Sequence, residues 1–246
     1  MKTALKIIII VTLVILQTLP VFILKPVGSK SMKNEFINLY YHPDEEKGAK
    51  EVFNLLVQKS DEIYQKMNFQ KTEPIDVYIY KTQKQLALRE AGFITLLFAP
   101  KWHIGDSHNG NIMMVSPYTP VKVHTHDSIL TATLHELVHA INYRINKEIS
   151  YFWDNSLATY LAGQVPKEIE YKHVDIPSIE DMQTNNGLKF GNMGGYAFSY
   201  KYIEFLDKNY GWDKVIAFAK GDGDYIEVFK KSEAEIYDQW CTYLKE

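Results

Sequence analysis

An apolar run near the start of the chain, from Ile7 to Leu24, constrains the fold more than any other feature. Its 18 residues reach the lower length limit for a helix that crosses a bilayer. Hydrocarbon offers the backbone no hydrogen-bonding partner, so a single span of this kind must be helical. Residues 1–30 are therefore predicted to form an uncleaved signal anchor and tether. A cleaved signal peptide, with a weak cleavage site at Val27–Ser29, is the alternative.

Both alternatives export the remaining chain, residues 31–246. We expect a single-pass protein of a bacterial cell membrane with its C-terminal domain outside, or a secreted protein if the segment is removed. The net charge is −3 and no basic stripe is present, so we expect no nucleic acid partner. The sequence has one cysteine, Cys241, which excludes an intramolecular disulfide and is expected to be a buried helix residue.

Strand and helix patterns alternate over residues 31–124. Runs rich in β-branched and aromatic residues predict strands, and near-helical spacing of apolar residues predicts helices. The expected strands cover residues 36–43, 75–82 and 111–117, and the expected helices cover 48–68 and 82–92. Residues 25–35 are expected to be a polar tether. This order predicts a mixed sheet.

From Thr125 onward the pattern predicts helices alone. Thr125 or Asp127 is expected to cap the first of them. Later helices are expected over residues 156–162, 196–209, 212–220 and 232–245. The predicted fold class is therefore α+β. Residues 31–246 form one domain, with a mixed-sheet half (31–124), a helical half (125–246) and a cleft between them.

The first predicted helix of the second half contains "TATLHELVHAINYRI", which holds the pattern H-E-x-x-H. Residues four apart lie on one face of a helix, so His135 and His139 can present ring nitrogens to one metal ion. A catalytic zinc site keeps three protein ligands and one open position. Zinc lowers the pKa of a water there, and Glu136 is placed to take its proton as general base. The pattern therefore predicts a zinc-dependent hydrolase.

Further motifs follow in order: "FWDNSLATYLAG" (152–163), "YAFSYKYIEFLDKNYGWDKVIAF" (196–218) and "SEAEIYDQWCTYLKE" (232–246). With the H-E-x-x-H helix and the strand before it, they resemble the gluzincin metallopeptidases, specifically the bacterial peptidase MA-like domain proteins. The resemblance covers roughly residues 36–245. It implies a zincin-like fold with an active cleft, a zinc (Zn2+) cofactor, and peptide or protein substrates.

The chain departs from that family at the third zinc ligand. The family's second helix reads W-L-x-E-G-L-A-x-Y-L-A-G, and its glutamate binds the metal, whereas Asn155 stands in that position here. Three interpretations remain open. Asp154 supplies the carboxylate from a helix N-cap; Asn155 binds the metal weakly; or the chain is a catalytically inactive pseudopeptidase that binds peptides or proteins.

Other residues carry weaker expectations. The resemblance implies that Tyr196 donates to the oxyanion of the tetrahedral intermediate, with Tyr200 as its rival. The strand at 111–116 is a candidate edge strand for an extended peptide. Trp153 is expected to pack at the start of the second helix. Four histidines ahead of the motif are expected to be surface or capping residues: His103, His108, His124 and His126.

Overall fold

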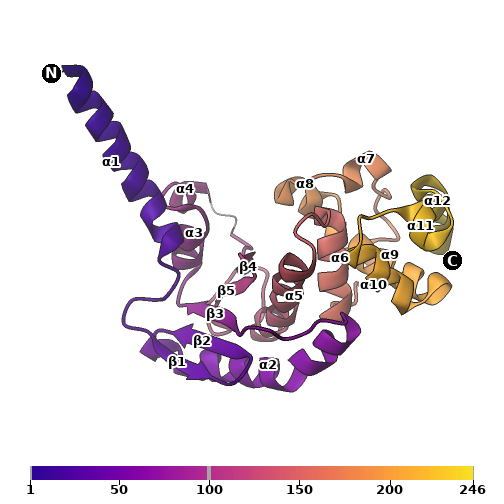
Figure 1. The fold of residues 1–246 in the computed structure, drawn as a ribbon, viewed down its shortest axis with the longest axis horizontal. Helices are drawn as coiled ribbons and strands as arrows, with labels where there is room; N and C mark the ends of the chain where they lie inside the picture. The colour runs from indigo at the N-terminus through magenta and orange to yellow at the C-terminus, as the bar shows by residue number, and fades with distance from the viewer. Residues whose placement is uncertain (1, 99–100, 246) are drawn as a thin grey trace. The chain divides into compact units, whose positions relative to one another are not determined.

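The computed structural model describes residues 2–98 and 101–245 (Figure 1). The chain divides into two compact units. The first comprises residues 1–60 and 71–136, and the second comprises residues 61–70 and 137–246. A five-stranded mixed sheet lies in the first unit and the second is helical, so the predicted α+β class is confirmed.

The sheet has the strand order β1-β2-β3-β5-β4. Its three central strands run parallel: β2 (Ile37–Tyr41), β3 (Ile75–Tyr80) and β5 (Asn111–Val115). The edge strands β1 (Lys30–Lys33) and β4 (Gly105–His108) are antiparallel to their neighbours. The central strands match the three predicted strands, and almost all of their side chains are buried. Burial on both faces explains why they read as nearly continuous apolar runs.

The two edge strands lie where the sequence predicts none. β1 falls within the predicted tether, and its backbone pairs with β2. The prediction that strand 111–116 is an edge strand is wrong, because β5 pairs with β3 on one side and β4 on the other. The edge is β4, whose sequence Gly-Asp-Ser-His carries no strand signal. Such strands depend on pairing with a neighbour rather than on side-chain preference.

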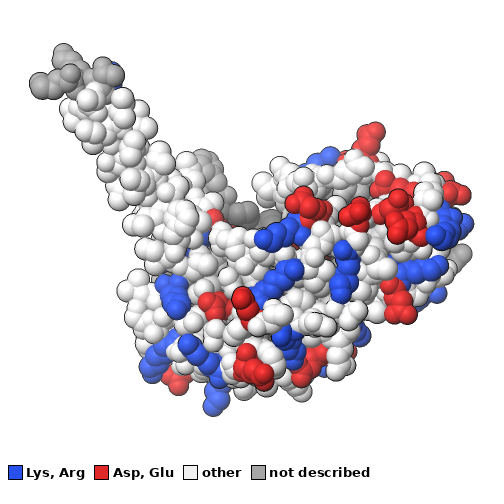
Figure 2. Space-filling view, in the orientation of Figure 1, with Lys and Arg blue, Asp and Glu red and all other residues white. Residues whose placement is uncertain are grey.

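Helix α1 (Lys2–Phe22) contains most of the predicted apolar run. By length and composition, its segment Ala4–Phe22 could cross a membrane, as either a signal anchor or a signal peptide. Its large apolar side chains are exposed, from Leu5 at 59% to Phe22 at 80%. Below its tip, the face of α1 visible in Figure 2 carries no charged residue.

The other helices of the first unit include α3 (Gln83–Ala91) and α4 (Thr95–Phe98), which lie at the foot of α1 in Figure 1. Helix α3 lies one residue inside the predicted range of 82–92 at each end. The side chain of Thr82 accepts a hydrogen bond from the backbone N–H of Gln85, and Gly92 ends the helix at a φ of +81°. Helix α4 is not predicted. The predicted helix at 48–68 is α2 (Glu46–Lys66), preceded by a 3-10 turn at Pro43–Glu45.

The motif lies on α5 (His126–Ile145). Thr125 caps this helix: its Oγ1 accepts from the N–H of Ser128 at 3.2 Å, and the Ser128 Oγ accepts from the N–H of Thr125 at 2.9 Å. Asp127, the alternative cap, lies inside the first turn with Oδ1 at 2.8 Å from Nδ1 of His126. Of the two predicted caps, Thr125 is therefore correct.

The second unit contains all four later predicted helices together with three short ones. They are α6 (Tyr151–Leu161), α7 (Ile179–Met182), α8 (Gly187–Asn192), α9 (Gly195–Tyr210), α10 (Trp212–Lys220), α11 (Tyr225–Phe229) and α12 (Glu233–Tyr243), with a 3-10 turn at Glu168–Glu170. Helix α6 begins five residues before its predicted start, at Tyr151 rather than Ser156. Cys241 lies on α12 as expected, but it is only partly buried.

An aromatic cluster forms the core of the second unit. Trp240 of α12 is fully buried, and its ring lies 5.2 Å from that of Tyr202 on α9 at an interplanar angle of 89°. Phe152 of α6 meets Tyr202 edge-on at 5.4 Å. Edge-to-face pairs of this kind add to the free energy that each ring gains from burial. The cluster joins α6, α9 and α12, which are distant in sequence.

Replacing Trp240 by alanine should therefore lower the free energy of unfolding by about 3–5 kcal/mol, because it removes a buried ring and leaves a cavity. The matched control is Ile226→Ala, whose side chain is 58% exposed and which should cost less than about 0.5 kcal/mol. Denaturant unfolding of the full chain in detergent, followed by near-UV circular dichroism, measures both. Equal losses in the two variants would contradict the assignment of this core.

Candidate metal centre

Helix α5 presents both histidines of the motif from one face. His135 and His139 are four residues apart, about one helical turn. His135 and Glu136 are each 7% exposed, and the side chain of His139 is 12% exposed. The structure therefore keeps all three side chains largely out of bulk solvent.

Asp154 of α6 lies behind His139. Its Oδ2 is 2.7 Å from Nδ1 of His139, and its Oδ1 accepts a hydrogen bond from the side-chain amide of Asn142 at 2.7 Å. A carboxylate beside Nδ1 favours a proton on that nitrogen, which leaves the lone pair on Nε2. Histidines that bind metal ions in proteins are commonly oriented in this way.

The N-cap of α6 is Ser150, whose side chain accepts from the N–H of Trp153. The interpretation that Asp154 is an N-cap at a flexible helix start is therefore wrong, because Asp154 lies in the first full turn. Adjacent helix residues point about 100° apart, so Asp154 and Asn155 face different directions. Asp154 contacts Nδ1 of His139 from this turn, and whether it also serves as a metal ligand stays a prediction.

Asn155 is 2% exposed, and its side-chain amide donates to the backbone carbonyl of Tyr151 at 2.9 Å. This bond occupies the Nδ2 atom, so any contact with a metal would involve Oδ1, a neutral and weak ligand for zinc. Within residues 2–98 and 101–245, no group of three or more His, Cys, Asp and Glu side chains is arranged to hold a metal ion. The two neutral imidazoles and the Asp154–His139 pair fit part of a zinc site, but among the described residues no carboxylate or thiolate completes it as a third ligand.

Glu136 lies against the start of the edge strand β4. A Cβ atom added to Gly105 would come within 2.9 Å of its Oε1. The absence of a side chain at position 105 therefore gives the Glu136 carboxylate its space. Because a Cβ in a strand points out of the plane of the sheet, the candidate general base lies on the face of the sheet at the start of β4.

His103 is a residue whose environment the sequence does not reveal. Its Nε2 lies 2.6 Å from Oε1 of Glu90 on α3, and its side chain is 19% exposed, so it is neither a surface nor a capping residue. Burial alone would lower the pKa of His103. The hydrogen bond and charge of Glu90, supported by the charges of Asp106 and Glu136, outweigh burial and raise the pKa above its ordinary value.

The two candidate tyrosines lie on α9. Tyr196 is 39% exposed, and its ring meets Phe190 of α8 edge-on at 5.0 Å. Tyr200 is 9% exposed, and its ring lies 5.2 Å from that of Tyr160 on α6. The greater exposure of Tyr196 favours it over Tyr200 for contact with a substrate, and its role as an oxyanion donor stays a prediction.

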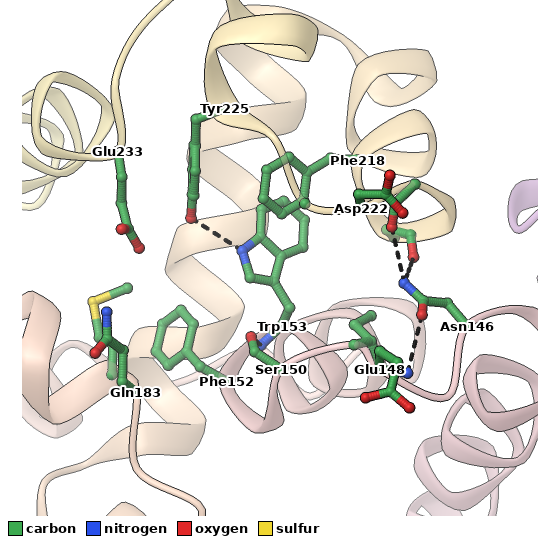
Figure 3. Close-up of a pocket in the computed structure, with 15 residues that line it drawn as sticks. Asn146, Glu148, Ser150, Phe152, Trp153, Gln183, Phe218, Asp222, Tyr225 and Glu233 are labelled. Carbon is green, nitrogen blue, oxygen red and sulfur yellow. Dashed lines mark hydrogen bonds between the residues drawn. The ribbon is translucent and has the colours of Figure 1, made fainter.

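A cavity of about 490 Å³ opens in the second unit beside Trp153, the residue next to Asp154 (Figure 3). The Trp153 indole stacks on Phe218 at 4.2 Å and donates to the hydroxyl of Tyr225 at 3.1 Å. Trp153 is buried, as predicted, but the cavity is not evident from the sequence. Three carboxylates line it without any lysine or arginine: Glu148, Asp222 and Glu233. Burial raises the pKa of the Glu233 carboxyl above its ordinary value.

Comparison with known proteins assigns no family. A scan of the chain against models of protein families finds no match. A search of the curated proteins also finds no match. The resemblance to gluzincins therefore depends on the quoted motifs, and the geometry of the described residues is the independent support for a function.

The His103–Glu90 pair should stabilise the fold in a pH-dependent way. Because the folded pKa of His103 is raised, the stabilisation is fully present below its unfolded value of about 6.5 and is lost as pH rises through the folded pKa. Replacing Glu90 by glutamine should therefore lower the melting temperature by a few degrees near pH 6 and by less at higher pH.

The matched control is Glu46→Gln, since Glu46 is exposed and pairs with a lysine, Lys30, rather than with a histidine. Melting temperatures of the full chain and both variants, measured in detergent between about pH 5 and 9, test whether the stabilisation depends on pH. A Glu90→Gln difference that does not change with pH would contradict a charged pair.

Proposed function

We propose that this chain is an exported, membrane-anchored zinc metallopeptidase with a zincin-like fold, which hydrolyses peptide bonds on the outer side of the membrane. The observation that carries the proposal is the Asp154–His139 pair at 2.7 Å behind the H-E-x-x-H motif. A packing histidine does not require a carboxylate at Nδ1, whereas a metal-binding histidine benefits from one because it fixes the ring and raises the basicity of Nε2.

Each residue then has a defined task. His135 and His139 would hold the ion, and Asp154 keeps His139 in the required tautomer and orientation. Zinc, when bound, supplies a Lewis acid that lowers the pKa of water and polarises a carbonyl. Glu136 takes the proton of the attacking water and delivers it to the leaving amine. Glu136 is 7% exposed, so it would act on a water that is largely screened from bulk solvent.

The position of β4 suggests how a substrate is held. In the described part of the sheet, β4 pairs with β5 alone, so its other edge faces away from the sheet. An extended peptide can add to such an edge through backbone hydrogen bonds, which favours unfolded or loop segments over folded ones. Glu136 lies against Gly105 on the face of the sheet at the start of this strand, so a peptide paired with β4 would lie about one strand spacing, about 4.8 Å, from the strand that the general base contacts.

The second candidate is a peptide-binding pseudopeptidase. It is favoured by the bond from Asn155 to the Tyr151 carbonyl and by the missing third charged ligand among the described residues. The same edge strand would hold a peptide without cutting it. The two candidates differ in whether the chain retains zinc, because only the peptidase needs the ion.

Metal content tests the proposal directly. The full chain in detergent should bind about one zinc ion after loading and dialysis, and His135→Ala should abolish binding. Asp154→Asn should weaken affinity by about 10- to 100-fold, because the residue positions His139 without being a ligand. The exposed His173→Ala is the control and should keep full binding. A folded wild-type chain that takes up no zinc would exclude the peptidase.

Two further variants separate catalysis from binding. Glu136→Gln should retain zinc and lower the rate of peptide hydrolysis by about 10²–10⁴-fold, since it removes the general base alone. Asn155→Glu should increase zinc affinity by supplying the third carboxylate. If zinc binding and hydrolysis appear only in Asn155→Glu, the natural chain is the binding module.

A further inference from the structure

A cluster of exposed apolar side chains lies between α3 and the end of α4. Phe93 is 51% exposed, Ile94 56%, Leu96 39% and Leu97 76%. The local sequence, Phe-Ile-Thr-Leu-Leu-Phe, contains no charge from 93 to 98. Scattered exposed apolar residues are ordinary, but four within five positions form a patch that favours an apolar partner. We name residues 93–97 the apolar segment.

The apolar segment is attached to α1, the candidate membrane span. The side-chain amide of Gln17 donates to the carbonyl of Ala91 at 2.9 Å and accepts from the N–H of Ile94 at 3.0 Å. Arg89 also donates to the carbonyl of Pro20 at 3.4 Å. Both polar atoms of the Gln17 amide are thus satisfied, as an amide in an apolar environment requires.

The contact is close enough to depend on a glycine. A Cβ added to Gly92 would lie 1.9 Å from the backbone oxygen of Gln17, and the φ of Gly92 is +81°, which favours glycine in any case. The backbone of α1 therefore meets the turn between α3 and α4 directly. This fit supports retention of α1 in the working protein, in line with a signal anchor.

The position of Gln17 along α1 sets the depth of the apolar segment relative to the end of the candidate membrane span. Gln17 precedes the end of the candidate span at Phe22 by five residues, which at about 1.5 Å per residue is about 7.5 Å along α1. If α1 crosses a bilayer with Phe22 at the membrane surface, the apolar segment beside Gln17 lies below that surface by a similar distance. Segments that lie in the membrane interface insert their apolar face by about 5–10 Å.

We propose that residues 93–97 are a second membrane contact, which inserts into the outer leaflet beside the foot of α1. The first unit would then be held at two points and could not rotate freely around its anchor. Lys84 and Lys101 flank the segment in sequence and are exposed, so their charges can remain at the headgroup level. This inference does not require the peptidase activity.

Site-directed fluorescence in a bilayer tests the proposal. The full chain, with Cys241→Ser, is reconstituted into vesicles of equal parts phosphatidylcholine and phosphatidylglycerol. Leu97→Cys and, separately, Ile94→Cys are labelled with an environment-sensitive dye. Val57→Cys on α2 is the matched control, because Val57 is 47% exposed and belongs to the same unit. Quenching by aqueous iodide and by nitroxide-bearing lipids is then compared at each position.

Labels at 94 and 97 should emit at shorter wavelength than the label at 57, with several-fold weaker iodide quenching and several-fold stronger lipid quenching. Iodide quenching equal to that at position 57 would overturn the proposal. Protection from both quenchers would also overturn it, because a protein surface, such as a second copy of the chain, would then cover the patch.

A fourth variant, Gln17→Leu, tests whether the bonds to α1 set the depth of residues 93–97, and it uses the label already placed at position 97. Gln17→Leu removes the bonds to Ala91 and Ile94 while preserving the apolar character of α1. In the labelled Leu97→Cys background, Gln17→Leu should reduce quenching by nitroxide-bearing lipids, because the apolar segment is no longer bonded to α1. Unchanged lipid quenching would show that the segment does not depend on α1 for its depth, which contradicts the two-point attachment.

Discussion

The contact between Asp154 and His139 gives the H-E-x-x-H motif a structural context that the motif alone lacks. It fixes the ring of His139, joins α5 to α6, and excludes Asp154 from a separate role as helix cap. Asn142, one turn further along α5, holds the other carboxylate oxygen. The carboxylate therefore contacts two residues on one helix: it accepts a hydrogen bond from Asn142, and its other oxygen lies 2.7 Å from Nδ1 of His139.

Much of the fold follows from patterns in the sequence. The three central strands are buried on both faces, so their apolar content marks them, and α3 is bounded by Thr82 and Gly92 as capping rules require. The edge strands β1 and β4 are not recoverable in this way. Their side chains are polar or mixed, and their strand conformation comes from backbone pairing with β2 and β5. Tertiary pairing overrides local preference at both edges of the sheet.

The sequence predicts the part of the site that lies on one helix, but not the contacts that depend on how helices are placed in the fold. A spacing of four places His135 and His139 on one face of any helix, whatever surrounds it. The partner of His139 depends on where α6 begins, and Ser150 moves that start five residues ahead of the prediction. The earlier start places Asp154 within the first turn of α6, where its carboxylate contacts His139 of α5. The same limit applies to His103 and Glu90, which are brought together by the fold rather than by spacing.

Within the first unit, the candidate membrane contacts and the candidate catalytic base are linked by α3. At one end, the turn after this helix is bonded to Gln17 of α1. Elsewhere along α3, Gln83 donates to the carbonyls of Lys101 and His103, and Glu90 pairs with the His103 ring, just before β4 begins at Gly105. A unit attached to the bilayer at α1 and at residues 93–97 would hold β4 at a defined distance from the lipid. Peptides that pair with β4 would then be drawn from segments close to the membrane surface, so the anchor would select substrates as well as retain the protein.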